Sequence, residues 1–171
     1  MSSILSSRAR WTRWVTALAI AALPAAGHAQ DLGISVGAKA PAAKVETLDA
    51  APADLATAIG KGPVFLEFWA TWCPNCEQLE PAVKAEYAKH GSTVQFVLVA
   101  VSVNETPAKA KDFVAKHKLP GTQYYDVHGA ATDAYDVPAT SYVVLIDKSG
   151  KVVYTGLGGT QDLDAAFKKL P

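Results

Sequence analysis

The sequence predicts one α/β domain, a central mixed sheet flanked by helices, and three observations carry that prediction. Two near-continuous apolar runs, residues 64–69 (VFLEFW) and 93–103 (TVQFVLVAVSV), are typical of strands that are buried on both faces of a sheet. Segments with apolar residues three and four positions apart, which are typical of helices, alternate with these strands. No repeat, linker or low-complexity tract interrupts residues 30–171, so we assign them to a single domain.

The first half of that domain begins with a short strand, which we predict at residues 44–48. An alanine-rich helix is predicted at 53–59, where it stops before a glycine. The apolar strand at 64–69 follows. Apolar residues at helical spacing then predict a helix over 73–90, which Gly91 closes.

The second half opens with the strand at 93–103 and a helix that Thr106 caps and Pro107 begins. Sequence signals in the remainder are weaker but continue the alternation of strand and helix. We predict a short strand at 123–125, a helix at 130–135, a hairpin of strands 142–146 and 152–154, and a last helix after Thr160.

The first thirty residues stand apart from this domain. They contain three arginines and no acidic residue, and an uncharged apolar run occupies residues 15–23. That run is far shorter than the roughly 20 residues that cross a membrane, and small residues at positions 27 and 29 fit a cleavage site. We therefore expect residues 1–29 to be a secretory signal peptide cleaved after Ala29, with an uncleaved membrane anchor as the alternative.

Composition and charge exclude several classes of function. The chain of 171 residues has 16 basic and 16 acidic residues, and removal of three arginines with the signal peptide leaves 13 against 16, a net charge of −3. Without basic runs, nucleic acid is not an expected partner. Two cysteines can form neither a disulfide framework nor a four-thiolate zinc site, and we expect no metal and no cofactor.

The chemistry is concentrated at Cys73 and Cys76. A buried strand ends at Trp69, and Cys73 opens the following helix, where unpaired amide groups and the positive end of the helix dipole stabilise a thiolate. Cys76 lies one turn later, shielded inside the helix and close enough to form a disulfide. This asymmetry predicts that Cys73 attacks and Cys76 resolves. A purely structural disulfide would gain little stability from so short a loop.

Residues 68–76 (FWATWCPNC) resemble the active-site stretch of thioredoxin-like proteins, in particular the exported TlpA/ResA branch. The resemblance begins at residues 36–41 (VGAKAP), includes Pro81, where thioredoxins kink the active-site helix, and continues through 145–151 (LIDKSGK). It implies a thioredoxin fold with a short N-terminal extension and thiol–disulfide exchange with client proteins that contain cysteine pairs. Members of this branch act in cytochrome c biogenesis or on copper-site proteins, where they reduce cysteines with electrons from a membrane donor.

The resemblance also places Glu67 at the position of the buried aspartate of thioredoxins. The strand pattern puts its side chain near Cys76, and a carboxyl group in an apolar site has a raised pKa and can accept the resolving thiol's proton. The alternative is a hydrated glutamate at the sheet edge that pairs with a lysine such as Lys61. Leu79 replaces an acid that is common in the branch, and we expect its neighbour Glu80, turned by about 100° on the helix, to be a poor substitute.

A second departure from the family concerns the loop that faces the disulfide. The family has a cis-proline six residues before the hairpin aspartate, Asp147, and this sequence has Ser141 there, whereas Pro138 would require a shifted loop. A cis bond without proline costs about 2.5–4 kcal/mol, so we expect a trans peptide before Ser141. Proline at this position would restore firm pairing with an extended client. From the resemblance, the expected substrate contacts are Trp72, Pro74, Thr140 and Ser141.

The leading functional hypothesis is a periplasmic disulfide reductase that acts as a monomer, with Cys73, Cys76 and Glu67 as catalytic residues. One alternative is an oxidase that donates its own disulfide, since the direction of exchange depends on the reduction potential. Another is a non-enzymatic adaptor or metal-binding domain, in which the two cysteines and His128 would hold copper or zinc. The sequence places His90 and His117 near helix C-termini, where we expect them to be solvated.

Overall fold

Residues 32–171 of the protein are described by a computed structural model, and the expected signal peptide, residues 1–29, lies outside them. Their strands are β1 (Lys44–Thr47), β2 (Pro52–Asp54), β3 (Val64–Trp69), β4 (Gln95–Val101), β5 (Thr122–Asp126), β6 (Tyr142–Ile146) and β7 (Val152–Leu157). Their helices are the 3₁₀ turn η1 (Leu55–Thr57), α1 (Pro74–His90), α2 (Pro107–His117), α3 (Ala130–Ala134) and α4 (Leu163–Phe167). None of these helices has the length and apolar character needed to cross a membrane.

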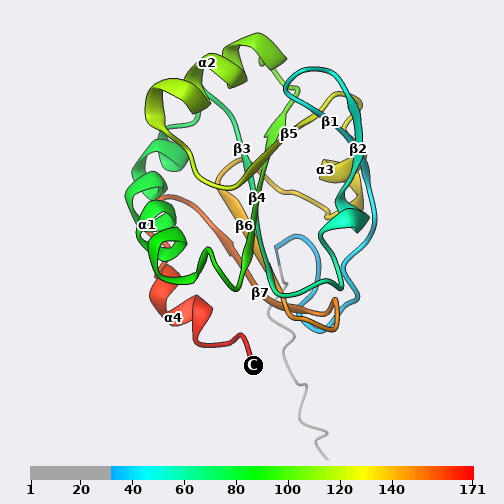
Figure 1. Ribbon diagram of the computed structural model, residues 1–171, viewed down its shortest axis with the longest axis vertical. Coiled ribbons are helices and arrows are strands. Elements are labelled where there is room, and N and C mark those ends of the chain that lie inside the picture. Colours follow the sequence, from blue (N-terminus) through cyan, green and yellow to red (C-terminus); the bar gives the residue numbers. More distant parts are fainter. Residues whose placement is uncertain (1–31) are drawn as a thin grey trace, which may run out of the picture.

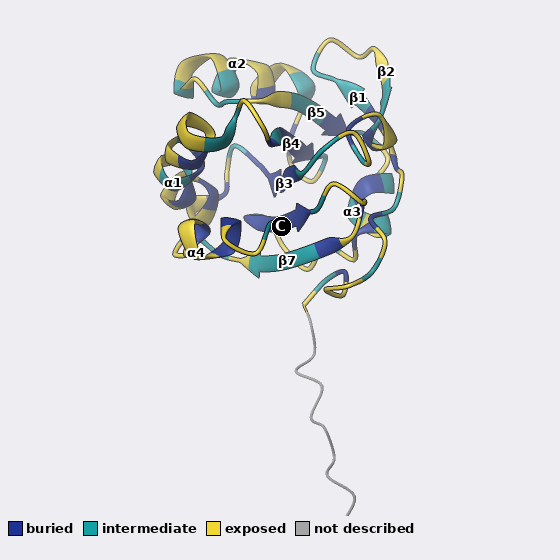
Figure 2. Ribbon diagram, turned by 60° about the horizontal axis from the view of Figure 1, so that its bottom comes forward, coloured by how far each residue is buried: buried dark blue, intermediate teal, exposed yellow. Residues whose placement is uncertain are grey.

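The strands form one mixed sheet in the order β2-β1-β5-β4-β3-β6-β7 (Figure 1). β3, β4 and β5 run parallel to one another, and the strands outside them are antiparallel to their neighbours. All six residues of β3 are buried, and Figure 2 shows that burial is concentrated in the central strands. The predicted strand that is buried on both faces is therefore confirmed, and so is the predicted fold class.

Helices cover both faces of the sheet. Because successive side chains of a strand point to opposite faces, neighbouring residues of β3 contact different helices. Trp69 lies against Phe113 of α2, with ring centroids 5.5 Å apart, whereas Phe68 lies 5.6 Å from Tyr135, which follows α3. In Figure 1, α1, α2 and α4 accordingly lie on one side and α3 on the other. Glu67 is two residues from Trp69, so its side chain faces the layer of α1 and α2.

The alanine-rich segment 53–59 is not the predicted helix. Ala53 pairs with Val45 in the β1–β2 ladder, and Asp54 keeps an extended backbone. The carboxylate of Asp54 then accepts the N–H of Ala56 at 2.9 Å and caps the single turn η1. Strand pairing and this local cap outweigh the intrinsic helix propensity of alanine. The other predicted elements are confirmed, with ends that differ by no more than three residues.

Candidate active site

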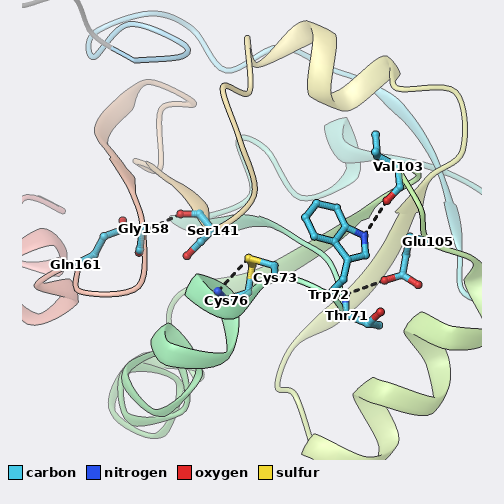
Figure 3. Close-up of a disulfide and its surroundings, with 9 residues drawn as sticks. All are labelled: Thr71, Trp72, Cys73, Cys76, Val103, Glu105, Ser141, Gly158 and Gln161. Atoms are coloured by element: carbon cyan, nitrogen blue, oxygen red, sulfur yellow. Dashed lines mark hydrogen bonds between the residues drawn. A yellow bond between two sulfur atoms is a disulfide. The ribbon is translucent and has the colours of Figure 1, made fainter.

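Cys73 and Cys76 form a disulfide at the start of α1, with their Cα atoms 5.3 Å apart (Figure 3). The chain leaves the central sheet at Trp69, and Cys73 is the N-cap residue of α1, followed by Pro74 at the first helical position. The Sγ atom of Cys73 accepts the N–H of Cys76 at 3.1 Å. The first cysteine therefore lies where the helix dipole and the N–H of Cys76 favour a thiolate, as the sequence predicts.

Exposure does not distinguish the two cysteines. Cys73 is 5% exposed and Cys76 is 8% exposed, so the expected shielding of Cys76 is confirmed, but in the disulfide form Cys73 is shielded as well. The turn after β3 brings Cys73 back toward the sheet, because its N–H donates to the carbonyl of Ala70 at 3.2 Å. The two residues differ instead in their position. Cys73 is the N-cap residue of α1, whereas Cys76 lies inside the helix and lines a cavity together with Glu67.

The loop between β4 and α2 holds the residues that precede Cys73. Glu105 is buried, and its Oε2 accepts the N–H of Thr71 at 2.7 Å while its Oε1 accepts the N–H of Thr106 at 3.0 Å. The indole of Trp72 donates to the carbonyl of Val103 at 2.8 Å (Figure 3). Sequence reasoning missed Glu105; the one available signal was an acid directly before the N-cap residue Thr106.

The loop that contains Ser141 lies on the opposite side of the disulfide from the loop between β4 and α2 (Figure 3). Ser141 is fully buried, and its N–H donates to the carbonyl of Phe68 at 2.9 Å. Its carbonyl accepts the N–H of Gly158 at 3.0 Å and the side-chain amide of Gln161 at 3.0 Å. Both backbone groups of Ser141 are thus bonded within the protein in this form, and neither is available to a client strand.

The backbone at Ser141 has an uncommon conformation. All peptide bonds in residues 32–171 are trans, which confirms the expectation for the bond before Ser141 and leaves Pro138 without a cis bond. The φ angle of Ser141 is +64°, in the left-handed region that favours glycine. The hydroxyl of Ser141 is buried and has no hydrogen-bond partner among the described residues. Three hydrogen bonds, rather than proline, therefore fix this loop.

Glu67 lies beneath the disulfide in a small, largely apolar cavity. Its neighbours in the sheet are Leu98 of β4 and Val143 of β6, so the alternative of a sheet-edge glutamate paired with the exposed Lys61 is wrong. Burial raises the pKa of Glu67 from an ordinary 4.5 to about 8, and a nearby carboxylate adds to that rise. At neutral pH Glu67 is therefore a protonated acid. The residues that line the cavity are Glu67, Trp69, Cys76, Glu80, Val83, Leu98, Phe113 and Leu119.

Glu80 shares this cavity, contrary to expectation. Glu80 is turned by about 100° from Leu79 on the helix, from which we expect it to point away. It is, however, four residues after Cys76, so Cys76 and Glu80 lie on the same face of α1. His117 is also not simply solvated. Its Nδ1 lies 2.8 Å from Oε2 of Glu80, and its ring stacks on Phe113 with centroids 3.7 Å apart.

The other histidines lie away from the disulfide or serve the packing of helices. His90 stacks on Phe167 of α4 and lies 3.4 Å from a carboxylate oxygen of Glu86. His128 is in an exposed turn after β5. Within residues 32–171, no three His, Cys, Asp or Glu residues are grouped so as to hold a metal ion, so the site from both cysteines and His128 is not formed.

Comparisons with known proteins agree with this geometry. The family model described as Redoxin matches residues 35–170. The chain is 33% identical over 139 residues to the thiol-disulfide oxidoreductase ResA of Bacillus thuringiensis subsp. konkukian, covering 80% of this chain and 79% of that protein. It is 34% identical over 120 residues to ResA of Bacillus subtilis, covering 70% of this chain and 66% of that protein.

A solved structure gives the same result for the fold. A putative thiol:disulfide interchange protein DsbE from Chlorobium tepidum aligns with a TM-score of 0.68 and 27% identity, covering 80% of this chain and 95% of that one. Sheet order, the cysteine pair at the start of α1 and these relatives lead to one assignment. The chain belongs to the Redoxin family and is a thiol–disulfide oxidoreductase with a thioredoxin fold.

Proposed function

We propose that the protein reduces disulfides of exported client proteins in the periplasm, with Cys73 as the attacking thiol and Cys76 as the resolving thiol. The observation that carries this proposal is the protonated acid, Glu67, in the apolar cavity that Cys76 also lines. Burial in such apolar surroundings disfavours a charge, so a Cys76 thiolate gains little stability. Because stabilisation of the reduced form makes a dithiol oxidising, a resolving thiol that lacks such stabilisation favours a pair that gives up electrons.

The reductive half of the cycle begins with the Cys73 thiolate at the start of α1. It attacks one sulfur of the client disulfide, and the other client sulfur leaves as a thiolate. In the reduced protein Glu67 is a carboxylate, because its proton passed to Cys76 when the disulfide was opened. Cys76 now transfers its thiol proton to this carboxylate and attacks Sγ of Cys73. The bond between Cys73 and the client breaks, and the second client sulfur leaves as a thiolate. Two electrons have passed to the client, and the Cys73–Cys76 disulfide is restored.

A dithiol donor at the membrane returns the protein to its reduced form. The donor thiolate attacks Sγ of Cys73, and Cys76 leaves with the electron pair of the disulfide bond. Glu67 gives Cys76 the proton that it accepted in the first half of the cycle, and the second donor thiolate resolves the mixed disulfide with Cys73. Glu67 therefore carries one proton back and forth, and its raised pKa suits this role near neutral pH.

Client binding involves the surface around Cys73. The exposed Trp72, 46% accessible, and the exposed Pro74 flank this cysteine in the sequence. Since the backbone of Ser141 is bonded internally, we place the client strand against the half-buried Thr140 beside it. The family resemblance suggests apocytochrome c or copper-site proteins as clients of a monomeric enzyme, exported by a cleaved signal peptide or held by an uncleaved one.

The reduction potential of the Cys73–Cys76 pair tests the direction of electron flow. Equilibration with glutathione mixtures should give a potential of about −270 mV, in the range of reducing thioredoxins. A value of about −120 mV would instead identify an oxidase that donates its disulfide. Cys76→Ser is the matched control. It retains Cys73 but cannot form the internal disulfide, so it measures how far glutathione alone forms a mixed disulfide with Cys73.

A further inference from the structure

Glu80 is a second carboxylate in the cavity that Glu67 and Cys76 line. It is held from two sides, because Lys84 donates to its Oε1 at 2.6 Å and His117 lies 2.8 Å from its Oε2. Burial alone would raise the pKa of Glu80, but the hydrogen bonds from Lys84 and His117 outweigh that effect and lower it. Glu80 is therefore a fixed negative charge at neutral pH.

The contacts behind Glu80 join α1 to α2. The amino group of Lys84 also donates to the carbonyl of His117, so one lysine ties the acid to the end of α2. The ring of His117 stacks on Phe113, and Phe113 in turn packs against Trp69 of β3. These contacts leave Glu80 little freedom to turn away from the cavity.

Among the described residues, none that lines the cavity carries a positive charge. Its ionisable groups are Glu67 from β3 and Cys76 and Glu80 from α1. The side chains that β4, α2 and the loop after α2 contribute are Leu98, Phe113 and Leu119, and all are uncharged. Lys84 and His117 contact Glu80 but are not among the lining residues, so the charge that Glu67 faces is that of Glu80.

We propose that Glu80 is a positioning residue that keeps Glu67 protonated while the disulfide is intact, and so holds ready the proton that Cys76 takes when it leaves. The inference rests on the proposed acid–base role of Glu67. Two ionised carboxylates in one apolar cavity repel each other strongly because little solvent screens them. The fixed charge of Glu80 therefore makes release of the Glu67 proton costly until Cys76 can receive it.

Carboxyl ¹³C NMR on oxidised, glutamate-labelled protein tests this role directly, because disulfide-bonded cysteines do not titrate. Loss of a resonance in Glu67→Gln assigns the titration of Glu67. In Glu80→Gln we expect its midpoint to fall by about one pH unit. Glu77→Gln is the matched control, since it removes an exposed charge from the same helix outside the cavity and should leave the midpoint unchanged. An unchanged midpoint in Glu80→Gln would overturn the proposal.

A kinetic measurement separates this proposal from the function on which it rests. The rate at which dithiothreitol reduces the Cys73–Cys76 disulfide, divided by the dithiothreitol thiolate concentration, should decline at a lower pH in Glu80→Gln than in the wild type. Glu67→Gln should remove that decline altogether. If Glu67→Gln retains the wild-type profile, the acid–base role of Glu67 fails. If Glu67→Gln loses the decline while Glu80→Gln keeps the wild-type profile, only the role of Glu80 fails.

Discussion

The two walls around the Cys73–Cys76 disulfide are built on different physical principles. Beneath it, Glu67 and Glu80 share an apolar cavity in which charge is costly. Across from it, the loop at Ser141 is shaped by hydrogen bonds of its own backbone and contributes no charged group at that residue. The cavity wall, which contains Glu67 and Glu80, can hold and move a proton. The loop wall, which contains Ser141, fixes the backbone conformation beside the disulfide. Variants in the cavity should therefore change pH dependence, and variants in the loop should change stability.

The largest expected effect on thiol–disulfide exchange comes from replacing the cysteines, which lie between the two walls. Cys73→Ser should abolish exchange, because no thiolate remains at the start of α1. Cys76→Ser should leave the client attached to Cys73 as a stable mixed disulfide, since nothing resolves it. Mass spectrometry of the adduct after incubation with a disulfide peptide identifies the cysteine involved. Equal trapping on Cys76 in the Cys73→Ser variant would contradict the assigned roles.

Proline at position 141 should damage the loop wall most. Proline fixes φ near −65° and has no N–H, whereas Ser141 has φ +64° and donates to the carbonyl of Phe68. Ser141→Pro should therefore lower the free energy of unfolding by more than about 3 kcal/mol, measured by urea titration of the oxidised protein. This reverses the sequence-based expectation that proline would restore the family's loop.

Glycine provides the matched control for that substitution. It adopts a left-handed φ without strain, so Ser141→Gly should retain stability within about 1 kcal/mol of the wild type. If the glycine variant is as unstable as the proline variant, the backbone conformation is not the cause. Loss of the buried Ser141 side chain from its packed position would then be responsible.

Sequence reasoning predicted the parts of the site that depend on local pattern. The strand that ends at Trp69, the helix that begins at Cys73 and the burial of Glu67 all follow from apolar periodicity and helix-end signals. The partnership of Glu80 with His117 was not predictable, because it joins two helices that only tertiary packing brings together. The helix expected at 53–59 failed for a similar reason, since pairing between β1 and β2 decides that segment.

Stability should depend on pH through the cavity wall. Because the folded-state pKa of Glu67 lies above its ordinary value, the folded protein keeps this proton between pH 4.5 and about 8 while the unfolded chain releases it. The free energy of unfolding therefore falls as pH rises through that window, by up to about 1.4 kcal/mol per pH unit.

Comparison with Glu67→Gln isolates this contribution. Between pH 5 and pH 8 the wild type should lose about 3 kcal/mol more stability than Glu67→Gln, because the other titrating groups are common to both proteins. Urea unfolding of the oxidised forms at both pH values measures the difference. Parallel pH dependences would show that Glu67 titrates near its ordinary value in the folded protein.

The smallest expected effect tests whether one side chain stabilises the loop wall. The amide of Gln161 donates to the carbonyls of Ser141 and Gly158 at 3.0 and 2.7 Å, and its oxygen accepts the hydroxyl of Tyr154 at 3.2 Å. Gln161→Leu removes these bonds and should destabilise the protein by about 1–2 kcal/mol. Thr160→Ala, a change of the exposed residue before Gln161, should leave the free energy of unfolding almost unchanged. The unfolding free energy of Gln161→Leu should fall equally at pH 5 and pH 8, because no ionisable group is altered. A loss confined to high pH would instead link Gln161 to the cavity and remove the distinction between the two walls.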